Sequence, residues 1–146
     1  MALKKFNIRV YGLLIEDGKI LIVDEIVRGK PVTKFPGGGL ELGEGPIDCI
    51  AREFLEETGM QVQVTEHFYT TDFFQPSAFN DDDQIISIYY KLQRTSELKP
   101  NHVLPVNDKE TLLSLRWLPL DELSEETVHL PIDKVVVRKL KAGIRN

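Results

Sequence analysis

Residues 37–60, with the sequence GGGLELGEGPIDCIAREFLEETGM, join a cluster of glycines to an acid-rich segment. Pro46 stands where proline is favoured in a first helical turn, and Gly59 stands where a left-handed residue commonly ends a helix. We therefore predict a helix over residues 46–58. At about 100° per residue, Glu53, Glu56 and Glu57 project together from this helix, at spacings i, i+3 and i+4.

This helix is predicted to be amphipathic. The residues expected to face the core are Ile47, Ile50, Ala51, Phe54 and Leu55. The three glutamates are expected on the opposite side. Like charges one turn apart destabilise a helix by a few tenths of a kcal/mol, and only Arg52 offers local compensation. The glutamates therefore form either an ordinary solvated surface or a site that binds cations.

The glycines that precede the helix favour a cation site. A backbone without side chains can approach a ligand closely, and its carbonyl groups can act as hard oxygen ligands beside carboxylates. Magnesium prefers oxygen ligands, commonly one or two carboxylates together with waters and substrate phosphates. The combination of glycines and glutamates therefore predicts a site for Mg²⁺ and a pyrophosphate.

The rest of the chain predicts a single α+β domain over residues 1–146, because strands and helices occur without regular βαβ alternation. Asp17-Gly18 is a strong hairpin signal between two strands. The strands are predicted at residues 8–15, 19–24, 33–35, 61–70, 85–93 and 111–120, with residues 28–32 as a loop. Two short helices are predicted at residues 119–131 and 133–143, the second capped by Gly143.

The bulk composition narrows the classes of partner. A net charge of −5 argues against binding a nucleic-acid polymer, because such binding depends on Lys and Arg neutralising phosphates. No apolar run is long enough to cross a bilayer, so no membrane association is expected. A single cysteine, Cys49, suits a reducing compartment. We therefore expect a cytoplasmic protein.

The segment resembles the Nudix box of the MutT-like Nudix hydrolase family, G-x5-E-x7-R-E-U-x-E-E-x-G-U, in which U is a bulky apolar residue. All seven fixed positions agree within residues 38–60. They are Gly38, Glu44, Arg52, Glu53, Glu56, Glu57 and Gly59. Phe54 is the one departure, since Leu, Ile or Val is more usual there. The resemblance extends to FPGG before the box and LRWLPLDEL near the C-terminus, and it implies an α/β/α sandwich around a mixed sheet.

The resemblance also implies roles for individual residues. Glu53, Glu56 and Glu57, assisted by the Gly38 carbonyl, would hold Mg²⁺, for which Mn²⁺ could substitute. Glu44 and Arg52 would support the site by fixing the loop against the helix. Glu53 and Glu57 would be catalytic. Glu53 is one candidate for the base that activates water. Glu110, in the loop before the last strand, is a second candidate, and the aspartates 81–83 compete for the same role.

The substrate expected from the resemblance is a nucleoside diphosphate linked to another moiety, cleaved at its pyrophosphate bond. Pro76, sixteen residues after Met60, slightly favours ADP-ribose or a similar nucleotide sugar. Phe73, Phe74 and Phe79 are expected to contact the base, or alternatively to close their loop onto the core. The alternatives are a nucleoside triphosphate pyrophosphohydrolase that releases a monophosphate and diphosphate, and a nucleotide-binding module without turnover. A homodimer is also expected.

Overall fold

The computed structural model describes residues 2–95 and 112–144. Its N-terminal part forms a β-hairpin. The strands β1 (Lys5–Glu16) and β2 (Lys19–Val27) are joined by Asp17-Gly18, as the sequence predicts. Both turn residues have positive φ angles, 51° and 74°, which Asp and Gly accept at low cost in a tight hairpin turn. Both strands extend beyond the predicted ranges.

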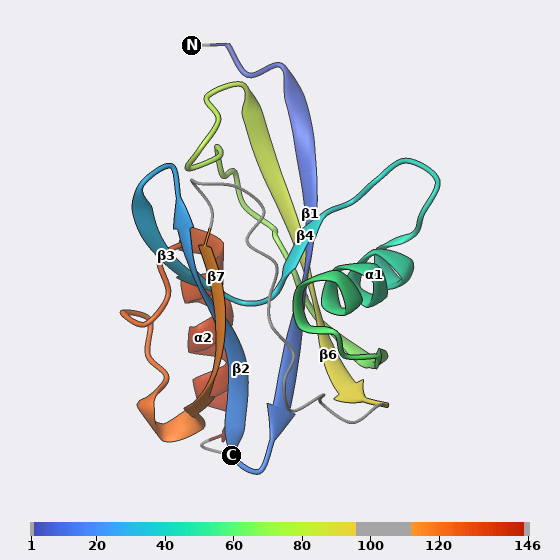
Figure 1. Ribbon diagram of the computed structural model, residues 1–146. Coiled ribbons are helices and arrows are strands. Elements are labelled where there is room, and N and C mark those ends of the chain that lie inside the picture. The colour runs from blue at the N-terminus through green and yellow to red at the C-terminus, as the bar shows by residue number, and fades with distance from the viewer. Residues whose placement is uncertain (1, 96–111, 145–146) are drawn as a thin grey trace.

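The hairpin belongs to a mixed sheet of seven strands (Figure 1). The remaining strands are β3 (Lys30–Lys34), β4 (Gly37–Gly39), β5 (Val62–Thr70), β6 (Asp83–Arg94) and β7 (Leu112–Pro119). The sheet order is β3-β2-β1-β6-β5, with β4 paired to β1 and β7 paired to β2. The β1–β6 pair is parallel and the other pairs are antiparallel.

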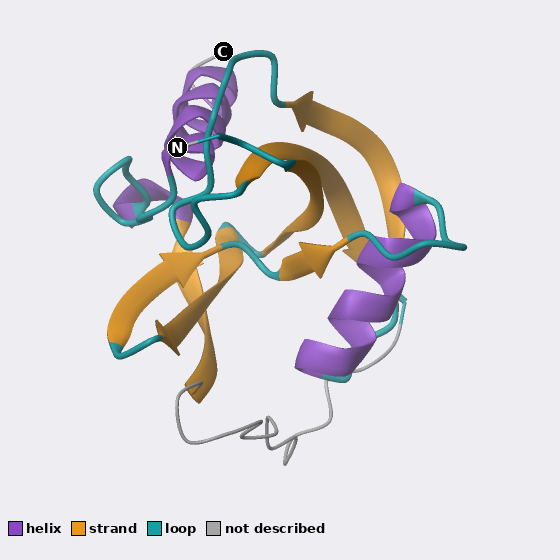
Figure 2. Cartoon of the chain, turned by 90° about the horizontal axis from the view of Figure 1, so that it is seen from above, coloured by secondary structure: helices purple, strands orange, loops and turns teal. Residues whose placement is uncertain are grey.

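The helices α1 (Pro46–Thr58) and α2 (Pro131–Ile144) cover opposite sides of the sheet (Figure 2). Successive side chains of a strand point to opposite faces. Val10 of β1 therefore packs in the core cluster that contains Phe54 of α1, and Tyr11 packs in the cluster that contains Val136 of α2. The predicted α/β/α sandwich is confirmed. Among the described residues, no helix is long and apolar enough to cross a membrane.

The ends of α1 agree with the prediction, but its buried face does not. Pro46 begins the helix, and Gly59 ends it with a φ of 73°. Ile50 and Phe54 are buried as expected, whereas Ala51 is exposed and Ile47 and Leu55 are 55% and 52% exposed. The predicted buried face was wrong because the helix turns part of its acidic side, in place of Ile47, Ala51 and Leu55, towards the sheet.

The rotation brings two of the three glutamates inward. Glu57 lies seven positions after Ile50, so at 3.6 residues per turn the two lie within about 20° of each other around the helix. Glu53 lies between Cys49 and Glu57 on the same side, and Cys49 is fully buried. Glu56 alone of the three faces solvent, with 59% of its side chain exposed. The expectation that all three acids lie opposite the buried face was therefore wrong.

Three smaller predictions also need correction. Pro31 and Val32 belong to β3 rather than to a loop, and Pro31 is tolerated because β3 is an edge strand of the sheet. Residues 119–131 form only the short 3-10 helix Leu120–Glu122 followed by turns. Gly143 lies within α2 and does not cap it. Glu110 lies outside the described residues.

Candidate active site

The carboxylate of Glu53 lies against the glycine strand β4. Gly38 pairs with Val10 of β1 and is buried between the sheet and α1. A Cβ at Gly38 would overlap the Glu53 carboxylate, with the oxygen Oε2 only 2.7 Å away. Any side chain at this position would therefore displace that carboxylate. The glycine here provides close approach between strand and helix.

Glu57 is the second inward glutamate, and its charge is poorly compensated. Its Oε2 is buried without a hydrogen-bond partner among the described residues, and the nearby backbone of Gly37 offsets only part of its charge. Burial raises the pKa of Glu57 to about 7, against the opposing effect of Lys34, and the neighbouring charge of Glu53 adds to the rise. Burial also raises the pKa of Glu53. The negative charge of this pair is therefore only partly compensated by neighbouring cations.

Arg52 fixes the loop before α1 to the helix. Its Nε and Nη2 atoms donate to the two carboxylate oxygens of Glu44, at 3.0 and 2.7 Å, and Nη2 also donates to the Gly39 carbonyl at 3.2 Å. The hydrogen bonds from Arg52 lower the pKa of Glu44 to about 2. This planar, two-pronged contact is one that lysine cannot make. It agrees with the supporting roles expected of both residues.

The same guanidinium also holds two of the expected metal ligands. Its Nη1 donates to Glu53 at 3.1 Å and to Glu56 at 3.2 Å. As arranged, the described residues do not gather three or more acidic, His or Cys side chains in a metal-binding cluster. The glutamates would have to turn away from Arg52 to share a cation.

The surroundings of Glu53 and Glu57 nevertheless fit a hard divalent cation. The pair offers buried carboxylate oxygens, one of them without a partner among the described residues, beside a glycine backbone that leaves their space open. Mg²⁺ and Mn²⁺ prefer such oxygen ligands. Glu56 is exposed at the edge of this site and could join it by a side-chain rotation.

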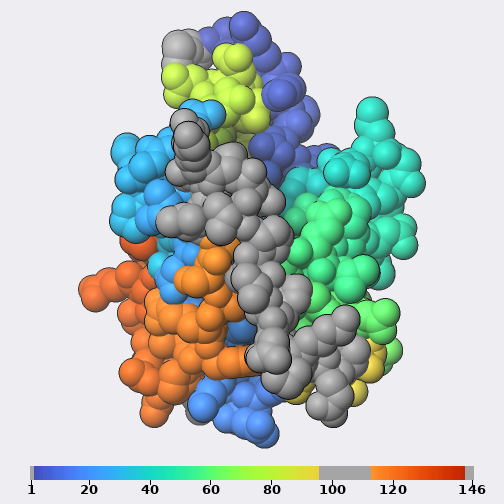
Figure 3. Space-filling model, viewed as in Figure 1, coloured from blue at the N-terminus to red at the C-terminus, as the bar shows by residue number. Residues whose placement is uncertain are grey.

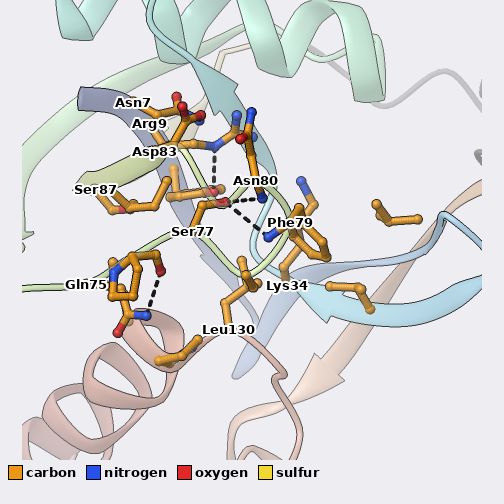
Figure 4. Close-up of a pocket in the computed structure, with 18 of the residues that line it drawn as sticks. Asn7, Arg9, Lys34, Gln75, Ser77, Phe79, Asn80, Asp83, Ser87 and Leu130 are labelled. Carbon is orange, nitrogen blue, oxygen red and sulfur yellow. Dashed lines mark hydrogen bonds between the residues drawn. The ribbon is translucent and has the colours of Figure 1, made fainter. Parts of the chain in front are cut away.

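A pocket of about 310 Å³ lies on the α2 side of the sheet, within the size range of small-molecule sites. Its floor is formed by alternate residues of β1 and β6, because residues two apart share a face. Residues 75–80, from the loop before β6, form another wall (Figure 4). Figure 3 shows this loop packed against the start of β1, where the Lys4 N–H donates to the Asp82 carbonyl at 2.7 Å.

Two cations line the pocket within electrostatic reach of the glutamates. Arg9 and Lys34 lie 5.8 and 5.9 Å from the centre of the Tyr11 ring. Burial opposes their charged forms, but Tyr11 and nearby acids, including Glu57 for both residues, raise the pKa of each above its usual value. Both side chains therefore stay charged in the pocket wall.

The two cations differ in how they are paired. Lys34 contacts Glu25 at 3.3 Å. The Arg9 guanidinium donates from Nε to the Tyr11 hydroxyl at 3.0 Å and makes no ion pair among the described residues. Most of its five N–H donors are therefore available to an anion in the pocket.

Of the three phenylalanines predicted to contact the substrate, one lines the pocket and two do not. Phe79 lines the pocket, whereas Phe73 and Phe74 are exposed and do not line it. The sequence interpretation did not identify Arg9 or Lys34. A signal for Arg9 was present, because Asn7, Arg9 and Tyr11 alternate with apolar residues around the start of the first predicted strand. This pattern places three polar groups on one face.

Comparisons with known proteins agree with this geometry. A relative from Mus musculus, nucleoside diphosphate-linked moiety X motif 6, is 28% identical over 128 residues, which are 87% of this chain and 38% of that protein. Phosphatase NudJ of Escherichia coli K12 is 38% identical over 64 residues, which are 44% of this chain and 41% of that protein. The matches thus span about two fifths of the length of these relatives.

A solved structure and a family model extend the likeness to most of the chain. A NUDIX hydrolase from Nitrosomonas europaea superimposes with a TM-score of 0.76 at 26% identity, covering 94% of this chain and 90% of that one. The model of the NUDIX domain matches residues 5–140. With its box residues arranged around a glycine strand and a charged pocket beside them, this chain belongs to the NUDIX domain family.

Proposed function

We propose that this protein hydrolyses the pyrophosphate bond of a nucleoside diphosphate linked to another moiety, with Mg²⁺ or Mn²⁺ bound at the box glutamates. The observation that carries the proposal is the distribution of charge. Two under-compensated carboxylates, Glu53 and Glu57, lie within electrostatic reach of the partly buried Arg9 and the buried Lys34. A pyrophosphate bridged by divalent cations would complement both sets.

The chain's own residues would divide the work in the following way. Arg9 and Lys34 would bind phosphate oxygens and hold the substrate in the pocket. Glu53 and Glu57 would hold the cation with Glu56, and one of them would accept a proton from the attacking water. The bound cation would neutralise phosphoryl charge and lower the pKa of a coordinated water. Glu110 remains a predicted alternative base.

ADP-ribose is the substrate that we favour. Pro76, whose spacing from Met60 favours ADP-ribose cleavage by the family resemblance, lines the pocket together with Phe79. An aromatic ring at this place could stack on a nucleobase. The name of the NudJ relative describes a phosphatase, so an assay should detect orthophosphate, diphosphate and nucleoside monophosphate separately.

The test is a substrate panel with Mg²⁺ that contains ADP-ribose, sugar nucleotides, dinucleoside polyphosphates and nucleoside triphosphates. We expect release of a nucleoside monophosphate, with ADP-ribose among the best substrates. Glu57→Gln should lower kcat by about 100-fold or more, as expected when a metal-site group is lost. Glu66→Gln, an exposed acid on β5, is the control and should retain activity.

Three outcomes would change the proposal. Release of diphosphate from triphosphates, with no cleavage of ADP-ribose, would identify a triphosphate pyrophosphohydrolase. Binding of nucleotides without any turnover would identify a binding module. Full activity of the Glu57→Gln variant would refute the assignment of the metal site.

A further inference from the structure

One end of the pocket contains a carboxylate that is not fully satisfied. Asp83, the first residue of β6, lines the pocket, and only 6% of its side chain is exposed. Its Oδ1 has no hydrogen-bond partner among the described residues, and the ammonium of the largely exposed Lys5 is 3.9 Å away. An enclosed carboxylate with so few donors is costly, so a further donor to it from a ligand in the pocket would be stabilising.

Asn7 lies beside this carboxylate, and its orientation follows from the chemistry of the pair. Its Nδ2 is 3.3 Å from Asp83 Oδ2. An ionised carboxylate only accepts hydrogen bonds, so Asn7 must direct its NH₂ group towards Asp83. The second N–H of that amide then remains as a donor. Figure 4 shows the two side chains next to one another at one end of the pocket, with Leu130 at the other.

The backbone around Asp83 holds the pair in place. The Ser77 N–H donates to the Asp83 carbonyl at 2.9 Å, and the Asp83 N–H donates to the Asn80 carbonyl at 3.2 Å. Each carboxylate oxygen has two lone pairs, so Asp83 can accept a donor from the pocket in addition to the Asn7 amide, without movement of the backbone.

We propose that Asn7 and Asp83 recognise a nucleobase that carries an exocyclic amino group, which in the favoured substrate ADP-ribose is adenine. This inference rests on the proposed function, because it assigns the nucleoside part of the substrate to this pocket. The adenine amino group would donate to Asp83, and the adjacent ring nitrogen would accept the second N–H of Asn7. Asn7 and Arg9 share one face of β1, so a single nucleotide can contact Asn7 and Asp83 with its base and Arg9 with its phosphate.

The pair would reject bases that present a carbonyl at the same place. In hypoxanthine, an oxygen replaces the amino group of adenine and would face the Asp83 carboxylate. In uracil, the corresponding position is also a carbonyl oxygen. A site built for an N–H donor discriminates strongly against an analogue without it, because the buried acceptor is left unpaired.

The experiment compares adenine with hypoxanthine in two independent assays. Calorimetric titration with AMP, IMP and UMP, without metal, measures recognition alone. The ratio of kcat/KM for ADP-ribose to that for its hypoxanthine analogue measures recognition during turnover. In the wild-type protein, both assays should favour adenine by about 10- to 100-fold. Asp83→Asn should bring both ratios to about one or below, because the new amide can donate to the hypoxanthine oxygen.

The matched control is Asp17→Asn, which removes the same charge from an exposed hairpin turn and should leave both ratios unchanged. Thermal melting establishes that each variant folds. If Asp83→Asn does not fold, Asn7→Ala serves instead and should reduce the preference for AMP over IMP.

The outcomes separate this inference from the function on which it rests. Equal binding of AMP and IMP by the wild-type protein, with ADP-ribose still cleaved, would overturn only the base recognition. An undiminished adenine preference in a folded variant of the pair would overturn it as well. A preference for AMP that depends on Asp83, in a protein that cleaves none of the panel, would support base recognition and refute the proposed hydrolysis.

Discussion

Substitution of Gly38 should separate activity from stability. In Gly38→Ala, the new methyl group would occupy the space of the Glu53 carboxylate, whose Oε2 lies 2.7 Å from the position that the methyl carbon would take. Ordinary contacts between such atoms are about 3.5 Å, so the carboxylate must retreat by about 1 Å. Displacement of a catalytic group by that amount can lower a rate by about 100-fold. We therefore expect kcat to fall by about that factor.

The fold should survive this substitution. The atoms nearest to the added methyl group belong to the end of a flexible side chain, which can rotate at small cost. Gly39→Ala is the mild control, because among the described residues its Cβ would meet only Arg9 Nη1, at 3.6 Å. Gly37→Ala is the severe control, since its Cβ would overlap the Val10 carbonyl and lie 2.7 Å from the Tyr11 Cα.

The assay is steady-state hydrolysis with Mg²⁺, measured together with thermal unfolding for all three variants. The expected pattern is a folded Gly38→Ala with a strongly reduced kcat, a nearly normal Gly39→Ala and a strongly destabilised Gly37→Ala. If Gly38→Ala hydrolysed the substrate at the wild-type rate, the position of Glu53 would not matter for catalysis. The reasoning from the glycine strand would then be refuted.

Two further predictions concern Arg52 and Asp133. Arg52→Lys should lower kcat about tenfold while the protein stays folded, because lysine cannot make the two-pronged contact with Glu44. Glu44→Gln should lower kcat to a similar extent. If the losses of kcat were fully additive in the double variant, the two residues would not act through a shared contact. Burial raises the pKa of Asp133 from 3.8 to about 6, so stability should fall by about 3 kcal/mol as the pH rises from about 4 to 6. Chemical unfolding at several pH values should show this loss, and Asp133→Asn should largely abolish it. An equal pH dependence in that variant and the wild type would refute the assignment.

The limits of α1 could be predicted from the sequence because they depend on local chemistry. Proline at the first helical position and glycine after the last are rules about a few neighbouring residues. The same holds for the hairpin at Asp17-Gly18. The direction in which α1 faces is different, because it depends on the element that packs against the helix. The glycine strand leaves room for carboxylates, so Glu53 and Glu57 face it in place of Ile47 and Leu55.

The pocket could not be predicted from the sequence, because it also depends on how separate elements pack together. Its floor depends on the parallel register of β1 and β6, in which Arg9 pairs with Ser87 and Asn7 pairs with Ile85. Many register choices satisfy the same apolar pattern, and a shift by one residue would exchange the two faces of a strand. The aspartate triplet was visible, yet only the fold distinguishes the buried Asp83 from its more accessible neighbours.

Two sets of cations compensate the repulsion between the glutamates of the Nudix box, and they act in different ways. Arg52 contacts Glu44 directly, and this contact fixes the loop whether or not a ligand is bound. Arg9 and Lys34 act on Glu57 only through space, across the glycine strand, and they form no ion pair with it among the described residues. Because no ion pair joins them in the described part of the chain, Glu57 can bind a metal cation, and Arg9 and Lys34 can bind a phosphate. We infer that the glycines, which have no side chains, keep Glu57 and these cations within electrostatic reach of one another.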